Sequence, residues 1–222
     1  MINYPDNIRV YDDFLPECEA DAVYNGIQNL NPSWFTLRRK AFDRGPSGQE
    51  YLYTKSWWNI FGGSEILHAP LDEKDRTMTY QFMGTDNHHA GCDCSVCDLH
   101  TMILERPVPE VYNQYIAEAM LTIYRPGDYL SCHHDERENR TWAFTYSLNK
   151  DWRPEWGGIL NCQDESGDWY ALSPKYNRLI LMDVSPTNSV NHFVSQVIPE
   201  APEYRVTFSG WYGHYDSLAN AA

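Results

Sequence analysis

Three side chains that can bind a metal ion stand in the second half of the chain. His133 and Asp135 are two positions apart, and on an extended backbone such residues project to the same side of the strand. His192 follows much later, at a separation that antiparallel return strands can close. Because two imidazoles and a carboxylate can bind one ion together, these residues form a candidate metal site.

Two histidines and one carboxylate that leave other coordination positions open are the ligand set of non-haem Fe(II) oxygenases. The tripeptide alone does not decide for a metal, because a surface His-His-Asp-Glu run is more often a solvated turn. His134 and Glu136 share the spacing of His133 and Asp135. The spacing therefore leaves two choices of ligand pair open.

A buried arginine is expected on a later strand. Alternation along 204–212 places Arg205, Thr207, Ser209 and Trp211 on one face. Burying a guanidinium is costly unless an anion meets it, and arginine is a natural bidentate partner of a carboxylate. The strand could hold a dicarboxylate that also chelates the metal. An ion pair with one of the chain's own acidic residues is the competing explanation.

Short strands must position these residues. After residue 118 the chain is rich in β-branched and aromatic runs separated by Gly, Pro, Asn and Asp turns, which favours an antiparallel sandwich or barrel. The predicted strands span 119–125, 141–148, 158–163, 168–172, 178–184, 191–198 and 204–212.

The first half of the chain supplies flanking segments. Residues 9–15 predict a short strand, and the apolar spacing after Pro16 predicts a helix. Residues 109–119 have the spacing of a second helix. The segment 36–62 has a Gly-Pro-Ser-Gly turn between two aromatic-rich runs, which indicates a hairpin or a long loop.

Cysteine and histidine residues gather in a possible insertion at 86–100. Thiolates of Cys92, Cys94 and Cys97 with the imidazole of His100 could form a closed, structural zinc site. The spacing differs from the paired Cys-Xaa-Xaa-Cys of zinc ribbons. A reduced loop with incidental cysteines explains the same residues.

The charge balance excludes several functions. The 222 residues include 17 Lys and Arg against 31 Asp and Glu, a formal net charge of −14. Without clustered cations, we expect no general binding of nucleic-acid phosphates and no binding to anionic membranes. No apolar stretch approaches the roughly 18 residues of a membrane span, and no signal sequence is recognised. The six cysteines do not have the spacing of a secreted disulfide framework, so we expect a cytoplasmic protein.

Four stretches of the second half carry a family resemblance. They are GDYL at 127–130 before HHD at 133–135, YSLNKDW at 146–152 with GGIL at 157–160, PKYNRLI at 174–180, and His192 through Arg205 to Trp211. Together they resemble the Fe(II)- and 2-oxoglutarate-dependent dioxygenases, in the prolyl-hydroxylase-like branch. The LNKDW run with its Gly-Gly pair is far more specific than the ligand spacing. DDFL at 12–15 also resembles the entry strand of that branch.

The resemblance implies a mainly β fold with flanking α-helices, namely a double-stranded β-helix, also called a jelly-roll or cupin-like barrel. It makes 1–222 a single dioxygenase domain, with N-terminal helices and loops in 1–118 and the jelly-roll core in 119–214. The offset from GDYL matches the family when His133, rather than His134, is the ligand.

The resemblance also implies a ligand set. Fe(II) is expected at the catalytic residues His133, Asp135 and His192. The distal carboxylate of 2-oxoglutarate is expected at Arg205, beside Tyr124 and Thr207.

Two further positions, Arg140 and Trp211, match residues near the substrate in prolyl hydroxylases. Ser147 departs from the pattern, because oxygen-sensing relatives carry a tyrosine there that helps to hold 2-oxoglutarate. The pocket is therefore expected to be wider at Ser147 or to be completed differently.

The implied activity is hydroxylation of an unactivated C–H bond with Fe(II), 2-oxoglutarate and O2, which releases succinate and CO2, with ascorbate as a supporting reductant. Asp135 in place of alanine or glycine disfavours a halogenase, because the carboxylate fills the halide position.

The substrate expected by analogy is a prolyl residue of a peptide or protein partner, and the acidic chain suits a basic or neutral peptide. The segment 36–62 could close over such a peptide. A free amino acid or another small molecule is the alternative substrate. The alternative of another class is a non-catalytic barrel or a zinc-stabilised binding module. The oligomeric state is left open.

Overall fold

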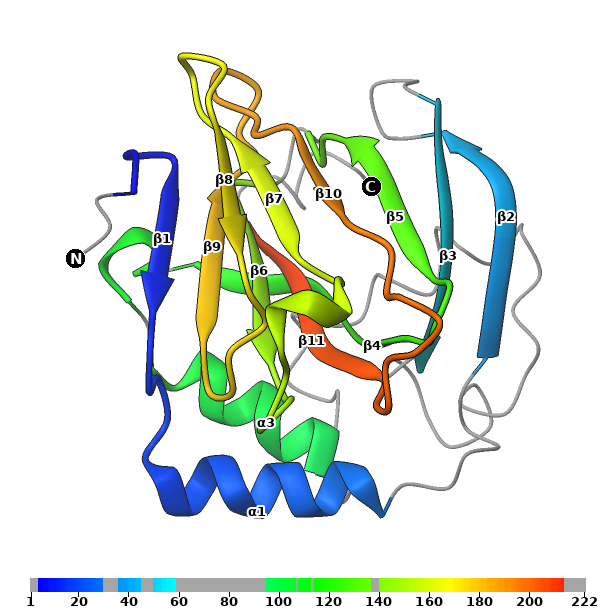
Figure 1. Ribbon diagram of the computed structural model, residues 1–222. Helices are drawn as coiled ribbons and strands as arrows, with labels where there is room; N and C mark the ends of the chain where they lie inside the picture. The colour runs from blue at the N-terminus through cyan, green and yellow to red at the C-terminus, as the bar shows by residue number, and fades with distance from the viewer. Residues whose placement is uncertain are drawn as a thin grey trace.

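The computed structural model describes residues 4–29, 36–44, 50–58, 95–106, 108–112, 114–136 and 140–213 (Figure 1). Its strands are β1 (Ile8–Tyr11), β2 (Thr36–Arg44), β3 (Glu50–Trp58), β4 (Tyr115–Tyr124), β5 (Tyr129–His133), β6 (Trp142–Ser147), β7 (Leu160–Gln163), β8 (Trp169–Leu172), β9 (Leu179–Asp183), β10 (His192–Val194) and β11 (Arg205–Gly213). The helices are α1 (Glu17–Gln28) and α3 (Ser95–Leu104), with 3-10 turns η4 (Pro109–Val111) and η5 (Pro154–Trp156).

The strands follow the order β1-β9-β6-β11-β4-β3-β5-β10-β7-β8, with β2 paired to β3, and every pairing is antiparallel. From β4 onward the chain passes back and forth between two halves of this order. One half contains β9, β6, β11 and β4, and the other contains β5, β10, β7 and β8. This is the jelly-roll arrangement, so the predicted fold class is confirmed.

Strand β3 joins the two halves. Its residues 56–58 pair with β4, and its residues 53–54 pair with β5. With β2 it forms an antiparallel pair, which confirms the hairpin alternative for the aromatic segment. Residues 45–49 and 59–62 lie outside the described part, and so does the predicted closure over a peptide.

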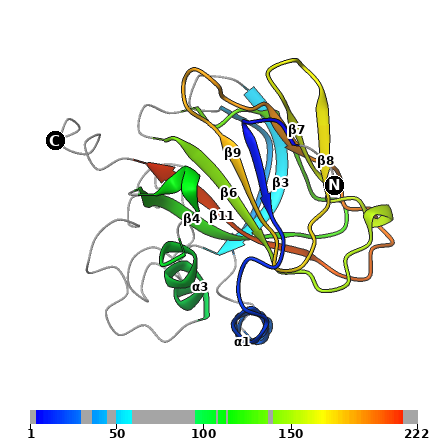
Figure 2. The same ribbon diagram turned by 90° about the vertical axis from the view of Figure 1, so that its left-hand side faces the viewer.

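Two hydrophobic clusters reflect the alternation along the central strands. Phe144 of β6 and Phe208 of β11 face α1 and α3, in a cluster that includes Val23 and Ile103. The intervening side chains face the space between the two halves of the sheet, where Met120 and other apolar residues form the second cluster. Figures 1 and 2 show α1 and α3 side by side on one side of the sheet.

The helix at α1 agrees with its predicted stripe, since Ala20, Val23 and Ile27 are buried. The helix predicted over 109–119 is wrong, because only η4 is helical there and β4 begins at Tyr115. Strand β4 pairs with β11 on one side and β3 on the other. Consecutive residues 119–122 are all buried, and a strand buried on both faces loses the alternation that distinguishes it from a helix.

Helix α3 was not predicted, although Leu99 and Ile103 are buried at helical spacing. Of the proposed zinc ligands, Cys92 and Cys94 lie outside the described residues, and Cys97 and His100 fall on the backbone of α3. The zinc site stays a prediction. Within the described part of the chain, no helix is long and apolar enough to cross a membrane.

Candidate metal centre

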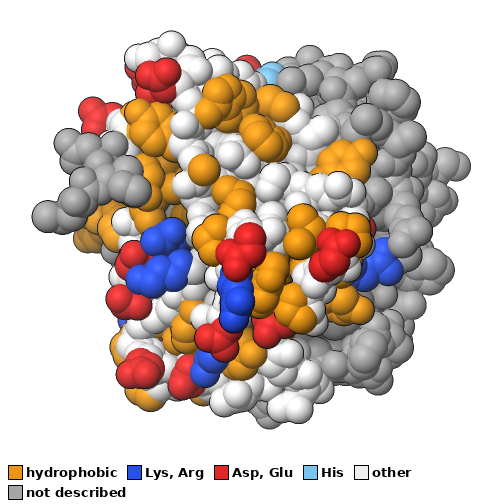
Figure 3. Space-filling view, in the orientation of Figure 1, with side chains coloured by type: hydrophobic (Ala, Val, Ile, Leu, Met, Phe, Trp, Pro, Cys, Tyr) orange, Lys and Arg blue, Asp and Glu red, His pale blue; other side chains and the backbone are white. Residues whose placement is uncertain are grey.

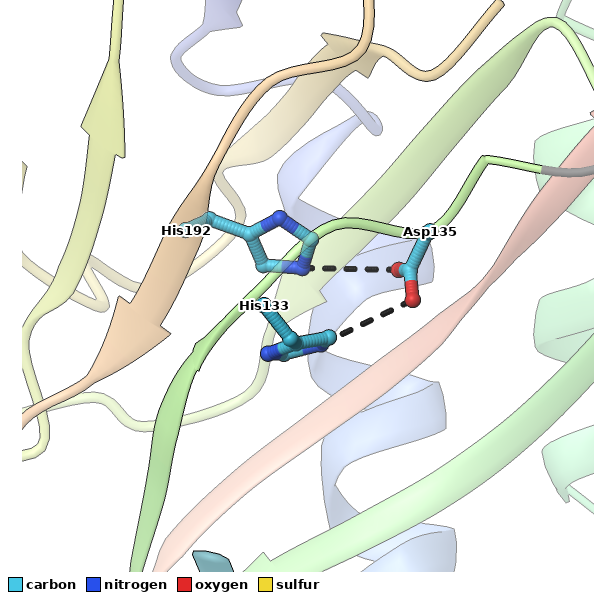
Figure 4. Close-up of side chains that lie close together, drawn as sticks. All are labelled: His133, Asp135 and His192. Atoms are coloured by element: carbon cyan, nitrogen blue, oxygen red, sulfur yellow. Dashed lines mark ion pairs between the residues drawn. The ribbon is translucent and has the colours of Figure 1, made fainter. Parts of the chain in front are cut away.

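The three predicted metal ligands come together at one end of the sheet. His133 ends β5, His192 begins β10, and the two residues are direct cross-strand partners. Asp135 follows β5 and turns its carboxylate toward both rings, as Figure 4 shows. One ligand atom from each residue lies within 4.8 Å of the other two. The cluster is thus the geometry expected of a site for one ion.

Backbone carbonyls orient both imidazoles. Nδ1 of His133 lies 2.8 Å from the carbonyl oxygen of Ser131, and Nδ1 of His192 lies 3.0 Å from that of Val190. Because a carbonyl only accepts, each Nδ1 carries the hydrogen and each Nε2 keeps its lone pair. Both Nε2 atoms face Asp135: that of His133 lies 3.6 Å from Oδ1, and that of His192 lies 3.4 Å from Oδ2. Both rings are therefore set for metal binding through Nε2.

The electrostatic surroundings keep Asp135 ionised. Burial alone would raise its pKa, but when the two histidines are protonated in the metal-free protein, the hydrogen bond with His192 and the positive charges of His192, His133 and Arg140 outweigh that effect. The net result is a pKa well below the usual range of an aspartate. The carboxylate is thus available as an anionic ligand across the physiological pH range.

Arg140 and Trp211 contact the carboxylate ligand rather than standing apart from it. The indole Nε1 of Trp211 donates to Oδ2 of Asp135 at 3.0 Å. The guanidinium carbon of Arg140 lies 3.8 Å from the centre of the Trp211 ring, and its Nη1 donates to the backbone oxygen of Asp135 at 3.4 Å. Arg140 is buried. These partners hold Asp135 in place, as outer-shell groups do around metal ligands.

The geometry decides between the two possible ligand pairs, His133 with Asp135 and His134 with Glu136. His134 pairs instead with Glu136, at 3.7 Å between Nδ1 and Oε2. Neither residue belongs to the cluster of His133, Asp135 and His192. Side chains one residue apart along an extended strand point in opposite directions, which explains why only one of the two pairs can face inward.

Arg205 is buried on the interior face of β11, opposite Tyr124 of β4. Its Nη1 donates to Oγ1 of Thr207 at 3.3 Å, and its guanidinium carbon lies 5.0 Å from the Tyr124 ring centre. Among the described residues no carboxylate forms an ion pair with it, and its Nε has no partner. The competing explanation, an internal acidic partner, therefore finds no support in the described part of the structure.

Burial shifts the pKa of Arg205 and the pKa of Tyr124 in opposite directions. It lowers the pKa of Arg205, an effect that Tyr124 partly offsets. It raises the pKa of Tyr124 to about 12, so the phenol stays neutral. The region around Arg205 is thus a buried positive charge among neutral hydroxyl groups, which favours an anion.

Two residues shape the surroundings of Arg205. Ser147 stands opposite Thr207 in the pairing of β6 with β11, and its buried Oγ has no partner among the described residues. Gly158 has a φ of +64°, and a Cβ there would come within 2.9 Å of Cδ of Arg205. The glycine of the GGIL motif thus makes room for the arginine, a role that the sequence did not reveal.

Comparisons with known proteins agree with this geometry. Residues 119–213 match the family model described as the 2OG-Fe(II) oxygenase superfamily. A prolyl 3-hydroxylase OGFOD1 of Mus musculus is 35% identical over 95 residues, which are 40% of this chain and 17% of that protein. Its Xenopus laevis counterpart is also 35% identical over 95 residues, 40% of this chain and 18% of that protein. The chain thus spans less than a fifth of the length of these relatives.

Solved structures show the same fold. A prolyl hydroxylase of Trichoplax adhaerens, in complex with a peptide fragment of the hypoxia inducible factor oxygen degradation domain, has a TM-score of 0.62 at 18% identity and covers 98% of this chain and 88% of its own. A prolyl-4-hydroxylase of Pseudomonas putida has a TM-score of 0.57 at 13% identity, covering 94% and 92%. The motif resemblance to the prolyl-hydroxylase-like oxygenases is confirmed over residues 119–213, and the fold over nearly the whole chain.

Proposed function

Because residues 119–213 match the 2OG-Fe(II) oxygenase superfamily, we propose that the protein is an Fe(II)- and 2-oxoglutarate-dependent oxygenase that hydroxylates a prolyl residue of a peptide or protein. The observation that carries the proposal is the cluster of His133, Asp135 and His192. One ligand atom of each residue lies within 4.8 Å of the other two, and backbone carbonyls favour the tautomer with the hydrogen on Nδ1 in both rings.

These donors fit Fe(II). Two imidazoles and one carboxylate occupy one face of an octahedral ion and leave the remaining positions to small molecules. Asp135 supplies the negative charge, and its hydrogen bond from Trp211 fixes the orientation of the carboxylate. A structural zinc site is closed by four protein ligands, whereas the described residues bring three together here.

Arg205 fits the distal carboxylate of 2-oxoglutarate. Its guanidinium is buried without a carboxylate partner in the described structure, although burial of an uncompensated cation is costly. Hydroxyl groups are added by Thr207 on the same strand and by Tyr124 and Ser147 on the two neighbouring strands. A dianionic cosubstrate would satisfy the guanidinium and the free hydroxyl of Ser147 together, despite the net negative charge of the chain.

When bound, Fe(II) and 2-oxoglutarate would activate O2: oxidative decarboxylation of 2-oxoglutarate to succinate and CO2 would take up one oxygen atom, and the other would convert a C–H bond of the substrate into an alcohol. The protein's own groups bind and orient. His133, Asp135 and His192 hold the ion, and Arg205 anchors the far end of the cosubstrate. The surrounding apolar residues, including Leu130 and Val194, limit access of water to the interior.

The prolyl substrate is supported by the relatives. The matched curated proteins are prolyl 3-hydroxylases, and the solved Trichoplax enzyme was captured with a peptide. Hydroxylation of a free amino acid is the alternative, and no feature of the described residues favours it. For this chain the position hydroxylated on the ring is left open.

Anaerobic titration with Fe(II) and 2-oxoglutarate tests the proposal. We expect the weak visible charge-transfer band of the chelated complex in the wild-type protein. His133→Ala should abolish the band by removing an iron ligand, and Arg205→Ala should weaken 2-oxoglutarate binding while iron still binds. Absence of the band in the wild type would refute the cosubstrate assignment. Mass spectrometry of a proline-containing peptide should then show the gain of one oxygen atom.

A further inference from the structure

A polar pocket of about 360 Å³ lies at the end of the sheet where β10 begins. It is lined by Asn7 before β1, the turn that follows β7, and the segment between β9 and β10. Figures 1 and 2 both place that turn and that segment at the same end of the molecule. None of the residues that carry the proposed function lines this pocket.

The pocket adjoins the metal centre through a shared segment. Asn191 lines the pocket and directly precedes the metal ligand His192. The backbone of Gln163, which also lines the pocket, donates to the carbonyl of Asn191 at 2.8 Å, and the preceding Cys162 pairs with His192. The lining thus begins one residue along the chain from a metal ligand, a separation that a peptide of a few extended residues can span.

Two oxygen atoms of the lining lack hydrogen bonds. Asn7 is only 4% exposed, and its Oδ1 has no partner among the described residues. The Oγ of Ser189 is likewise buried without a partner in that part of the chain. A buried acceptor without a partner is costly, so two of them on one pocket favour a ligand that donates hydrogen bonds.

The amide groups of the lining point to the same conclusion. The Nδ2 of Asn191 donates to Oε1 of Gln163 at 3.2 Å, and the Nε2 of Gln163 donates to the carbonyl of Gly167 at 3.0 Å. Nδ2 of Asn188 donates to Asp183 at 3.4 Å. Since these N–H donors are directed to the protein itself, the pocket offers mainly acceptor oxygens to a ligand.

The charge of the pocket is negative. Asp164 and Glu165 line it, and among the described residues no cationic side chain does. Asp164 accepts hydrogen bonds from Tyr170 and from two backbone N–H groups, so neutral groups hold it in place without cancelling its charge. Figure 3 shows acidic side chains at the top of this face, near the β7–β8 turn, while its Lys and Arg side chains lie lower.

We propose that this pocket binds the side chain of a lysine or arginine that neighbours the reacting residue of the protein substrate. The identity of the ligand as part of a substrate rests on the proposed function. A basic side chain supplies both the positive charge and the several N–H donors that the pocket lacks. At about 30 Å³ for each water, the space holds on the order of ten waters, more than one bare metal ion needs.

Binding of a peptide set tests the pocket independently of catalysis. Each fluorescently labelled peptide has a central proline and one lysine at a different position on either side, with norleucine at the same position as its matched control. Fluorescence anisotropy with the full chain gives each Kd. We expect one position at which lysine binds about tenfold more tightly than norleucine, the scale of a charge-assisted hydrogen bond.

Glu165→Gln should reduce that lysine preference to less than about twofold, because it removes the exposed carboxylate of the pocket. Glu203→Gln is the matched control, since Glu203 is exposed and outside the lining, and it should keep the full preference. Ser189→Ala should reduce the preference about threefold by removing one acceptor.

Several outcomes would overturn the inference. They are a lysine preference at no position, a preference that Glu165→Gln leaves intact, and an equal loss in Glu203→Gln. Glu165-dependent binding of Ca²⁺ in calorimetry without any lysine preference would assign the pocket to a metal ion instead. If the Glu165-dependent preference is present but no peptide gains oxygen, the pocket stands and the proposed hydroxylation fails.

Discussion

One face of β11 turns toward the helices, and the other turns toward the interior between the two halves of the sheet. Val206, Phe208 and Tyr212 belong to the cluster with α1 and α3. Arg205 and Thr207 are just as buried but face the metal centre side. The first face gains free energy from apolar burial, whereas the second buries a charge and hydroxyl groups, which only a bound ligand can fully satisfy.

Within this one strand, the helix-facing side therefore contributes mainly to stability, and the interior side mainly to ligand binding. Substitutions on the helix-facing side should lower the free energy of unfolding and leave the ligand set unchanged. Substitutions on the interior side should alter binding and catalysis with little loss of stability. Each prediction below tests that separation, beginning with the largest expected effect.

Asp135→Ala tests the interior side and should abolish the proposed hydroxylation. It removes one metal ligand and leaves the Nε1 of Trp211 without its acceptor. Because changes in outer partners alone cost about 10–100-fold, we expect a loss of more than about 100-fold in succinate formation. Iron content and circular dichroism give the two readouts. A variant that keeps full iron stoichiometry would contradict the ligand assignment.

Phe208→Ala tests the helix-facing side. Phe208 is completely buried against Phe144, with ring centres 5.6 Å apart. We expect a loss of about 3–5 kcal/mol in the free energy of unfolding, measured by urea denaturation. Phe208→Leu should cost less because it leaves a smaller cavity. At temperatures where the variant is folded, the Fe(II) and 2-oxoglutarate band should persist, and its disappearance would break the separation of the two faces.

Trp211→Phe probes how the interior face orients a ligand. The ring is kept beneath Arg140, but the N–H that donates to Asp135 is lost. Iron affinity should fall by about 10–100-fold, and the melting temperature of the metal-free protein should change little. Titration with a competing chelator measures the affinity. Unchanged affinity would show that the indole hydrogen bond does not position Asp135.

Asp12→Asn provides a surface reference that belongs to neither face. Asp12 pairs with Arg178 at 2.5 Å and with Lys175 at 3.2 Å, and the hydrogen bond from Arg178 is the largest cause of its lowered pKa. Because the folded pKa lies below the unfolded one, the stabilisation is complete above the unfolded pKa and is lost as pH falls through the folded pKa.

The exposed position limits the effect of Asp12→Asn to less than about 1 kcal/mol near neutral pH. The difference from the wild type should shrink as the pH falls below about 4. Urea denaturation at several pH values measures it. A difference that grows on acidification would contradict the sign of the shift.

The secondary structure was predicted more accurately from the sequence in the second half of the chain than in the first half. The strands after residue 140 were placed within a few residues, because turn residues separate short runs rich in β-branched and aromatic residues. The interval 109–119 was misassigned, because pairing of β4 with β11 and β3 overrides a helical spacing. For α3, the spacing of Leu99 and Ile103 was a usable signal that lay in a segment with little other pattern.

The candidate site was predictable to the level of side chains but not of their partners. Residue type and spacing made His133, Asp135 and His192 candidates, the family resemblance selected them over His134 and Glu136, and the structure brings them together. The carbonyls of Ser131 and Val190, which set the tautomers, could not be predicted, since every residue carries a carbonyl.

The amino-acid sequence by itself determined which residues share a face, because side-chain direction alternates with every step along a strand. That parity set Arg205 and Thr207 apart from Val206 and Phe208. Only the tertiary structure decided which faces meet, that His192 pairs with His133, and that Arg205 finds no carboxylate among the described residues. These facts depend on strand register and long-range packing, to which residues far apart in the sequence contribute together.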